Sequence, residues 1–232
     1  MITVRKSTER GHANHGWLDS FHTFSFASYH DPKHMGFGAL RVINQDKVEP
    51  NEGFGTHSHA DMEIISYVVA GKLAHKDSMG TVATLERGDV QVMSAGTGVT
   101  HSEFNGGSQD PVRFLQIWIV PDKRGYQPRY ADKRFSDAEK QDKLCLIASA
   151  DGRGASLPIH QDASVFASVL GKGNTLEHVL ASGRSAWLQV IGGDVTVNGV
   201  QLRSGDAASV TAESQVAIRA DADSEVLLFD LA

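Results

Sequence analysis

The sequence predicts an all-β protein built from two antiparallel, jelly-roll-like β-barrel domains. Three observations support this fold class: short β-rich runs separated by glycine turns, an internal repeat, and a charged segment between the two halves. The chain has 232 residues, which is enough for two domains of roughly 100 residues each. Many short strands at this spacing are typical of β-sandwiches and barrels.

Runs rich in β-branched and aromatic residues recur through both halves. In the first half they are ALRVIN (39–44), EIISYVVAG (63–71), KLAHKD (72–77), TVATLERGD (81–89), VQVMSAG (90–96) and FLQIWIV (114–120). In the second half they are AWLQVIGG (186–193), DVTVNGV (194–200), DAASV (206–210), QVAIRA (215–220) and EVLLFDL (225–231). Glycines mark the turns between them, and Asn198-Gly199 between β-branched residues is a strong hairpin signal.

The segment 121–143 is polar and charged, and it predicts a connection between two β-domains. We therefore place a first domain at 1–125, a charged linker at 126–143 and a second domain at 144–232. No long amphipathic helix is evident, and only FSDAEKQ (135–141) is expected to form a short helix.

An internal repeat relates the two halves. YVVAG (67–71) aligns with LQVIG (188–192), and RGDVQVM (87–93) aligns with SGDAASV (204–210). Extended without gaps, these alignments pair four residues of each half: His57 with His178, His59 with Leu180, His101 with Ile218, and Glu103 with Ala220. Of these four positions the second half keeps only one histidine, so we expect the second domain to be a degraded copy of the first.

Composition excludes several classes of function. The formal net charge is −6 and no dense Lys/Arg cluster occurs, so direct nucleic acid binding is not expected. The single Cys145 cannot form an internal disulfide, which favours a reducing compartment. No apolar signal region opens the sequence, and the longest apolar runs are too short to span a bilayer. We expect a cytoplasmic protein that does not enter a membrane.

Two histidines stand two residues apart in GFGTHSHADMEI (53–64), and a second pair follows in GTGVTHSEFN (96–105). Side chains at i and i+2 lie on the same face of a strand, so His57 with His59, and His101 with Glu103, can each aim at one point. The intervening turns allow the two pairs to meet across a barrel. Three imidazoles and one carboxylate suit one divalent transition metal, and we expect Fe(II), with Cu, Mn, Ni and Zn also compatible. Such an ion would retain open positions for water, a chelating substrate or O2.

Other assignments compete with this one. Glu63 shares the strand parity of His57 and His59, and Asp61 lies nearby, so either carboxylate could replace Glu103. The remaining histidines are expected to be surface, core or supporting residues: 12, 15, 22, 30, 34, 75, 160 and 178. Ser102 has no nucleophile elbow around it, and Cys145 lies in an apolar run typical of a core strand. No phosphate-binding or dinucleotide-binding fingerprint occurs.

The pattern HxHxxxE at His57, His59 and Glu63, followed by His101 and Asn105, resembles the two general cupin motifs. The match is incomplete, because no glycine stands six residues before His57 and the second motif lacks its proline. Three longer strings resemble the pirin family: residues 16–50 (GWLDSFHTFSFASYHDPKHMGFGALRVINQDKVEP), 57–80 (HSHADMEIISYVVAGKLAHKDSMG) and 88–105 (GDVQVMSAGTGVTHSEFN). The resemblance implies a bicupin with metal only in the first barrel.

The pirin resemblance also implies ligands and an activity. Carried over, the ligands are His57, His59, His101 and Glu103, so the resemblance prefers Glu103 to Glu63. Similar bacterial members act as quercetin 2,3-dioxygenases, which open a flavonol ring with O2 and release carbon monoxide. We expect this activity, with Glu103 as the catalytic proton acceptor and a monomeric enzyme. The alternative is a metal-dependent regulatory protein that acts by binding partner proteins, as other pirins do.

Overall fold

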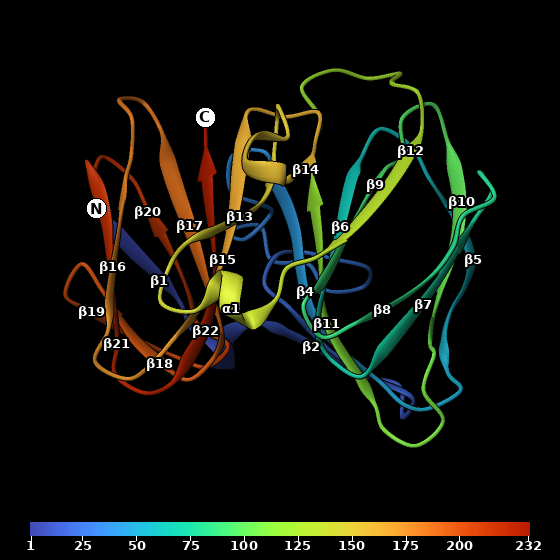
Figure 1. Ribbon diagram of the computed structural model, residues 1–232, viewed down its shortest axis with the longest axis horizontal. Coiled ribbons are helices and arrows are strands. Elements are labelled where there is room, and N and C mark those ends of the chain that lie inside the picture. Colours follow the sequence, from blue (N-terminus) through green and yellow to red (C-terminus); the bar gives the residue numbers. More distant parts are fainter. The chain divides into compact units, whose positions relative to one another are not determined.

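The computed structural model describes all residues, 1–232, and divides the chain into two compact units. The N-terminal unit comprises Gly11–Arg134 and Ile159–Gln161. The C-terminal unit comprises Met1–Arg10, Phe135–Pro158 and Asp162–Ala232. Both units consist almost entirely of strands (Figure 1).

This division differs from the boundaries expected at 1–125, 126–143 and 144–232. The first ten residues belong to the C-terminal unit, because β1 (Ile2–Arg5) pairs with β20 (Ala207–Val210). The expected linker contains a strand, β12 (Arg129–Arg134), which pairs with β9 (Asp89–Ser94) of the N-terminal unit. The short helix expected at 135–141 is α1 (Asp137–Lys140), which begins with a capping box between Ser136 and Glu139.

The N-terminal unit has a seven-stranded and a four-stranded sheet. The larger sheet has the order β12, β9, β6 (Glu63–Ala70), β11 (Val112–Ile119), β4 (Leu40–Val48), β3 (Leu18–His22) and β2 (Gly11–Asn14). The smaller has the order β5 (Gly53–His59), β10 (Val99–Asn105), β7 (Lys72–Asp77) and β8 (Val82–Glu86). Every strand pair in this unit is antiparallel.

The C-terminal unit repeats this arrangement. Its larger sheet has the order β1, β20, β17 (Ser185–Gly192), β22 (Ser224–Leu231), β15 (Ala163–Leu170), β13 (Cys145–Ser149) and β14 (Leu157–Pro158). Its smaller sheet has the order β16 (Thr175–Val179), β21 (Gln215–Ala220), β18 (Asp194–Val197) and β19 (Val200–Arg203). Two 3-10 turns, η1 (Ser7–Glu9) and η2 (Arg153–Ala155), complete the unit.

The all-β class and the two-domain organisation are confirmed, but the barrel description is not. The strands of each unit form two separate hydrogen-bonded sheets rather than one closed ring. In the C-terminal unit an apolar core fills the interior, with Leu188, Val195, Val216 and Ile218 among its buried residues. No helix in the structure has the length and hydropathy needed to cross a membrane.

The predicted Asn198-Gly199 turn joins β18 to β19. Both residues have positive φ, 45° and 86°, as the tight hairpin turn requires. In the N-terminal unit the long strands β4, β6 and β11 carry buried apolar residues at adjacent positions, so side chains on both faces of these strands are buried.

Candidate metal centre

Strands β5 and β10 carry the residues predicted as ligands. They pair antiparallel, with His57 opposite His101 and His59 opposite Val99. Residues at i and i+2 share one face of a strand, so each predicted pair projects to one side. The register shifts between His101 and Glu103, and such a bulge changes the direction in which a side chain points.

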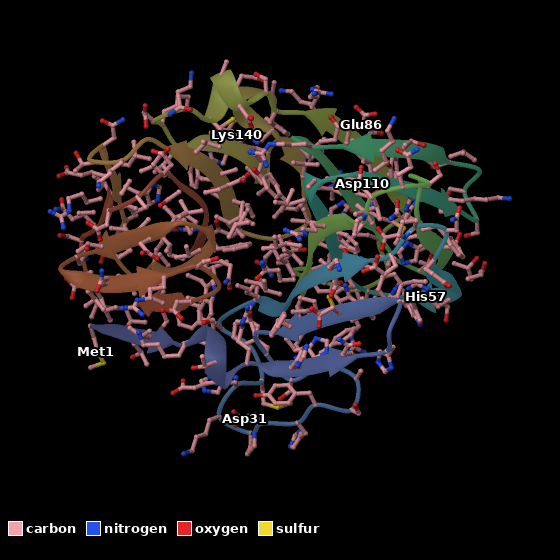
Figure 2. All side chains as sticks on the ribbon, turned by 90° about the horizontal axis from the view of Figure 1, so that it is seen from below. Met1, Asp31, His57, Glu86, Asp110 and Lys140 are labelled. Atoms are coloured by element: carbon pink, nitrogen blue, oxygen red, sulfur yellow. The ribbon has the colours of Figure 1, made fainter.

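The three imidazoles meet at one place in the N-terminal unit, where Figure 2 labels His57. The ring centroids of His57 and His59 are 4.8 Å apart, and those of His57 and His101 are 4.5 Å apart. The centroids of His59 and His101 are 5.0 Å apart. One potential ligand nitrogen from each ring lies within 4.8 Å of the other two, so the three rings can face a single ion.

A second group of possible ligands overlaps the first. His75, on β7, lies with His101 and Glu103, and their potential ligand atoms are also within 4.8 Å of one another. In the pairing of β10 with β7, Glu103 is opposite His75 and His101 is opposite Asp77. His101 is shared by both groups, so it connects the carboxylate of Glu103 with the other two predicted imidazoles.

The electrostatics of the imidazoles suit metal binding. Burial, together with the charges of neighbouring histidines, lowers the pKa of His101 to about 3 and that of His59 to about 4. Both rings are therefore neutral near pH 7, which is the form that binds a metal. His101 is 1% exposed, and neither of its ring nitrogens has a hydrogen-bond partner. Buried polar atoms of this kind require a partner, and an ion facing the three rings would supply one.

His57 is oriented by the backbone of its own strand. Its Nδ1 lies 2.8 Å from the carbonyl oxygen of Gly55. A carbonyl only accepts, so Nδ1 carries the proton and Nε2 keeps its lone pair for a ligand bond.

Glu103 is held in place by the larger sheet. Its Oε1 accepts hydrogen bonds from the Ser66 hydroxyl at 2.9 Å and from Gln91 Nε2 at 2.6 Å. Its Oε2 accepts a hydrogen bond from Gln116 Nε2 at 2.5 Å. Tyr130, on the strand in the expected linker, donates to Gln91 Oε1 at 3.1 Å. Burial raises the pKa of Glu103 above its ordinary value, although the surrounding hydrogen bonds and histidines act in the opposite direction.

The rival carboxylates have other partners. Glu63 accepts a hydrogen bond from Ser94 at 2.7 Å and lies 3.1 Å from His160 Nδ1. Asp61 accepts a hydrogen bond from the backbone N–H of Gly125 at 2.8 Å. Neither residue belongs to a group of possible metal ligands, whereas Glu103 does.

A cavity of about 230 Å³ lies beside the candidate ligands, and His57, His59 and Glu103 form part of its wall. Leu18, Phe26, Phe54 and Trp118 contribute apolar surface. Its other lining residues are Ala13, His15, Ser20, His22, Ala27, Ser28, Asn44, Asp46 and Gln116. The volume lies just under the range of about 300–1,000 Å³ that is usual for small-molecule sites. A compact organic molecule in this cavity would touch the candidate ligands directly.

Neither Trp118 nor the polar wall of the cavity, formed by Ser20, His22, Asn44 and Asp46, was predicted from the sequence. The Trp118 ring stands edge-on to His59, with centroids 4.9 Å apart, and its Nε1 is buried without a hydrogen-bond partner. On the polar wall, burial raises the pKa of Asp46 to about 7, opposed by a hydrogen bond from Ser20 and assisted by the charge of Glu103. The expected strand at 39–44 ends before Asp46, and no strand was expected at 18–22, so the sequence reasoning did not pair these residues.

The C-terminal unit has no comparable cluster at the corresponding strands. His178, on β16, is opposite Val216 of β21, as His57 is opposite His101. Structural pairing therefore matches His101 with Val216 and Glu103 with Ile218, two positions away from the sequence alignment. Val216, Ile218, Ala220 and Leu180 are all part of the apolar core, so either alignment gives the same conclusion.

His178 has a partner of its own, because its Nε2 lies 2.7 Å from Asp230 Oδ2. Arg184 also donates to Asp230. Burial alone would raise the pKa of Asp230, but the hydrogen bonds from His178 and Arg184 outweigh it and hold this pKa below its ordinary value. His178 is therefore part of an ion-pair cluster of the C-terminal unit.

Known protein families and relatives match both halves of the chain. The family model described as Pirin matches residues 3–119, and the model described as Quercetinase C-terminal cupin domain matches residues 146–231. The quercetin 2,3-dioxygenase of Escherichia coli K12 is 50% identical over 231 residues, covering 100% of this chain and 99% of that protein. A pirin-like protein of Caulobacter vibrioides is 42% identical, covering 100% of both.

Solved structures are also similar. The structure of the bacterial pirin YhhW of Escherichia coli in complex with nickel(II) has a TM-score of 0.95 and 49% identity, covering 100% of this chain and 99% of that chain. A quercetin 2,3-dioxygenase of Acinetobacter baumannii has a TM-score of 0.80 at 22% identity, covering 98% of this chain and 85% of that one, and so supports the fold alone. Matched along both halves by these models and relatives, the chain belongs to the pirin family and consists of two cupin-type domains.

Proposed function

We propose that this protein is a metal-dependent dioxygenase that opens the ring of a flavonol such as quercetin with O2 and releases carbon monoxide. His57, His59, His101 and Glu103 would hold one divalent ion, for which Fe(II) is our first choice. The observation that carries the proposal is the meeting of three imidazoles beside an aromatic-lined cavity, one of them buried with both nitrogens unpartnered. The name of the Escherichia coli relative supports the substrate class.

The donor set fits a divalent transition ion, because neutral imidazoles and one carboxylate are ligands that such ions accept. When bound, the ion would act as a Lewis acid that lowers the pKa of a substrate hydroxyl. The nickel(II) complex of YhhW shows that a close relative binds a divalent ion.

The protein's own residues would bind and orient the substrate. Trp118 and Phe26 stand edge to face, with ring centroids 5.4 Å apart, and both line the cavity. Flat aromatic surfaces of this kind favour a planar aromatic ligand. The unpartnered Nε1–H of Trp118 is a hydrogen-bond donor available to an oxygen of that ligand. Binding in a mostly enclosed apolar cavity would keep bulk water from the reacting groups.

Glu103 would accept the proton of the flavonol hydroxyl. Its carboxylate lines the cavity and is fixed by Ser66, Gln91 and Gln116, so it needs no rearrangement to receive a proton. Burial raises the pKa of Glu103 above its ordinary value, which makes its carboxylate a stronger base than a solvent-exposed one. In the overall reaction both oxygen atoms of O2 enter the ester product, and one ring carbon leaves as carbon monoxide with its own oxygen.

The test is turnover of quercetin by metal-loaded protein. In air, the flavonol absorption should bleach, O2 should be consumed and carbon monoxide should appear in equal amount. Anaerobic samples and the double variant His57→Ala/His101→Ala should show none of these. The control is His178→Ala, which removes a histidine of the C-terminal unit and should keep full activity. Bleaching without carbon monoxide, or equal rates in the double variant, would contradict the proposal.

A further inference from the structure

Four buried polar side chains form a wall of the cavity that the reaction proposed above does not use. Ser20 and His22 lie on β3, and Asn44 and Asp46 lie on β4. In the pairing of the two strands Ser20 is opposite Asp46 and His22 is opposite Asn44. All four line the cavity that also contains His57, His59 and Glu103.

Polar groups at such positions are costly unless they are hydrogen-bonded, because burial removes their contact with water. Ser20, His22, Asn44 and Asp46 are between 2% and 5% exposed. The corresponding strand of the other unit, β15, carries Phe166, which packs against the apolar core, between the buried Ser164 and Ser168. That strand buries no carboxylate, amide or imidazole.

The wall is held rigid by bonds among its own members. The Ser20 hydroxyl donates to Asp46 Oδ1, and His22 Nδ1 lies 2.9 Å from Asn44 Oδ1. These contacts occupy one oxygen of Asp46 and the oxygen of Asn44. Asp46 Oδ2 and Asn44 Nδ2 make no hydrogen bond within the protein. One is an acceptor and the other a donor.

A donor and an acceptor two residues apart on one strand face are complementary to hydroxyl groups, which donate and accept at once. We propose that Asn44 and Asp46 bind a second hydroxyl of the substrate, beyond the hydroxyl at the histidines, and so select polyhydroxylated aromatic compounds. Asp46 Oδ2 accepts from this hydroxyl and Asn44 Nδ2 donates to it, while Ser20 and His22 fix both side chains. This inference rests on the proposed function for the identity of the substrate, but not for the wall itself.

Selectivity follows from the unpaired groups. A ligand without the second hydroxyl offers no partner to the Asn44 donor and the Asp46 acceptor that line the cavity, and sites built to hydrogen-bond a hydroxyl discriminate against analogues that lack it. Galangin, which carries ring hydroxyls beyond the 3-position, should therefore bind more tightly than 3-hydroxyflavone, which has only that one. We expect a ratio of about 10-fold, the order that one hydrogen bond in the site supplies.

The experiment measures binding of galangin and 3-hydroxyflavone to nickel-loaded protein without O2, by quenching of tryptophan fluorescence. Asn44→Ala and Asp46→Ala should each reduce the galangin to 3-hydroxyflavone affinity ratio towards 1, mainly through weaker binding of galangin. Asp46→Asn leaves two donors on the wall and should also lose the preference. The control Gln45→Ala changes the neighbouring residue of β4, outside the cavity lining, and should keep the wild-type ratio.

The outcomes separate this inference from the proposed function. An unchanged ratio in Asn44→Ala and Asp46→Ala, with metal content intact, would overturn the inference even if quercetin is turned over. A wild-type ratio near 1 would overturn it as well. Failure of turnover in air, with a ratio that still depends on Asn44 and Asp46, would contradict only the dioxygenase activity. A purely structural role would weaken both ligands equally and leave the ratio unchanged.

Discussion

Replacing His101 by leucine should separate the stability of the N-terminal unit from its capacity to bind metal. Without metal, the imidazole is buried and both its nitrogens lack partners. A buried donor or acceptor without a partner costs about 1–3 kcal/mol, whereas an apolar replacement of similar size costs under about 1.5 kcal/mol. The free energy of unfolding of metal-free His101→Leu should therefore be roughly 0–3 kcal/mol above that of metal-free wild type.

Metal should stabilise the wild type more than the variant. An ion present at 100 times its dissociation constant stabilises the folded protein by about 2.7 kcal/mol. Loss of one ligand often weakens metal binding by about 10–100-fold, which corresponds to roughly 1.4–2.7 kcal/mol and removes most of this stabilisation. At the same nickel(II) concentration the variant should gain only about 0.4–1.4 kcal/mol, so nickel shifts the difference between the two proteins towards the wild type.

The assay is urea unfolding followed by tryptophan fluorescence, in a Trp187→Phe background. Trp17 and Trp118 then report on the N-terminal unit alone. With a slope of about 1–3 kcal/mol/M, nickel should raise the wild-type midpoint by roughly 1–3 M relative to EDTA-treated protein. The control His178→Leu, which removes a paired histidine of the C-terminal unit, should keep this shift.

The reasoning fails if His101→Leu keeps the wild-type nickel shift. It also fails if the metal-free variant is less stable than wild type by more than about 0.5 kcal/mol, because the imidazole would then stabilise the unit without an ion.

Three further outcomes are expected. Glu103→Gln should lower nickel content at equilibrium dialysis strongly, whereas Glu63→Gln should retain it; the reverse would favour the general cupin ligand pattern. Because the folded-state pKa of Asp230 is lowered, its ionised carboxylate stabilises the C-terminal unit at pH values above the unfolded-state pKa. This stabilisation is lost as the pH falls through the folded-state pKa. Asp230→Asn should accordingly cost about 1.5–3 kcal/mol at pH 7 and little at pH 2 in thermal unfolding, and equal losses at both would contradict the sign. Deleting Met1–Arg10 should increase hydrogen exchange in β20 without changing metal content, since β1 covers that strand; unchanged exchange would refute this.

Much of the fold could be predicted because it depends on local pattern. The runs at 63–71 and 114–120 became β6 and β11, and the Asn198-Gly199 turn adopts the positive φ angles that its residues favour. The histidine pairs were found for the same reason, since a period of two along a strand is a property of the sequence itself.

The domain boundaries could not be predicted, because they depend on pairing between distant segments. Residues 2–5 gain their partner about two hundred positions later, in β20. The charged residues at 129–134 favoured a polar linker, but this segment forms the strand β12. β12 lies at the edge of its sheet and pairs on one side only, and charged residues are tolerated on edge strands.

The choice between Glu103 and Glu63 also lay beyond strand parity. Both carboxylates are buried, but Glu63 lies on β6 of the larger sheet and Glu103 on β10 of the smaller one. Only the pairing of β10 with β5 and β7 brings a carboxylate beside His101. The resemblance to pirins favoured Glu103, and its place in a group with His75 and His101 supports the same choice.

Comparison of the two units indicates that the polar cluster around His101 and Glu103 is present for function rather than for folding. They have the same strand order, so the architecture is satisfied by either set of residues. Where the N-terminal unit buries His101 and Glu103, the C-terminal unit buries Val216 and Ile218 in a continuous apolar core. Burying polar groups in place of aliphatic ones lowers stability unless they gain partners. The N-terminal unit therefore retains an arrangement that its fold does not require, and an ion with a hydroxylated ligand would supply the missing partners on both walls of the cavity.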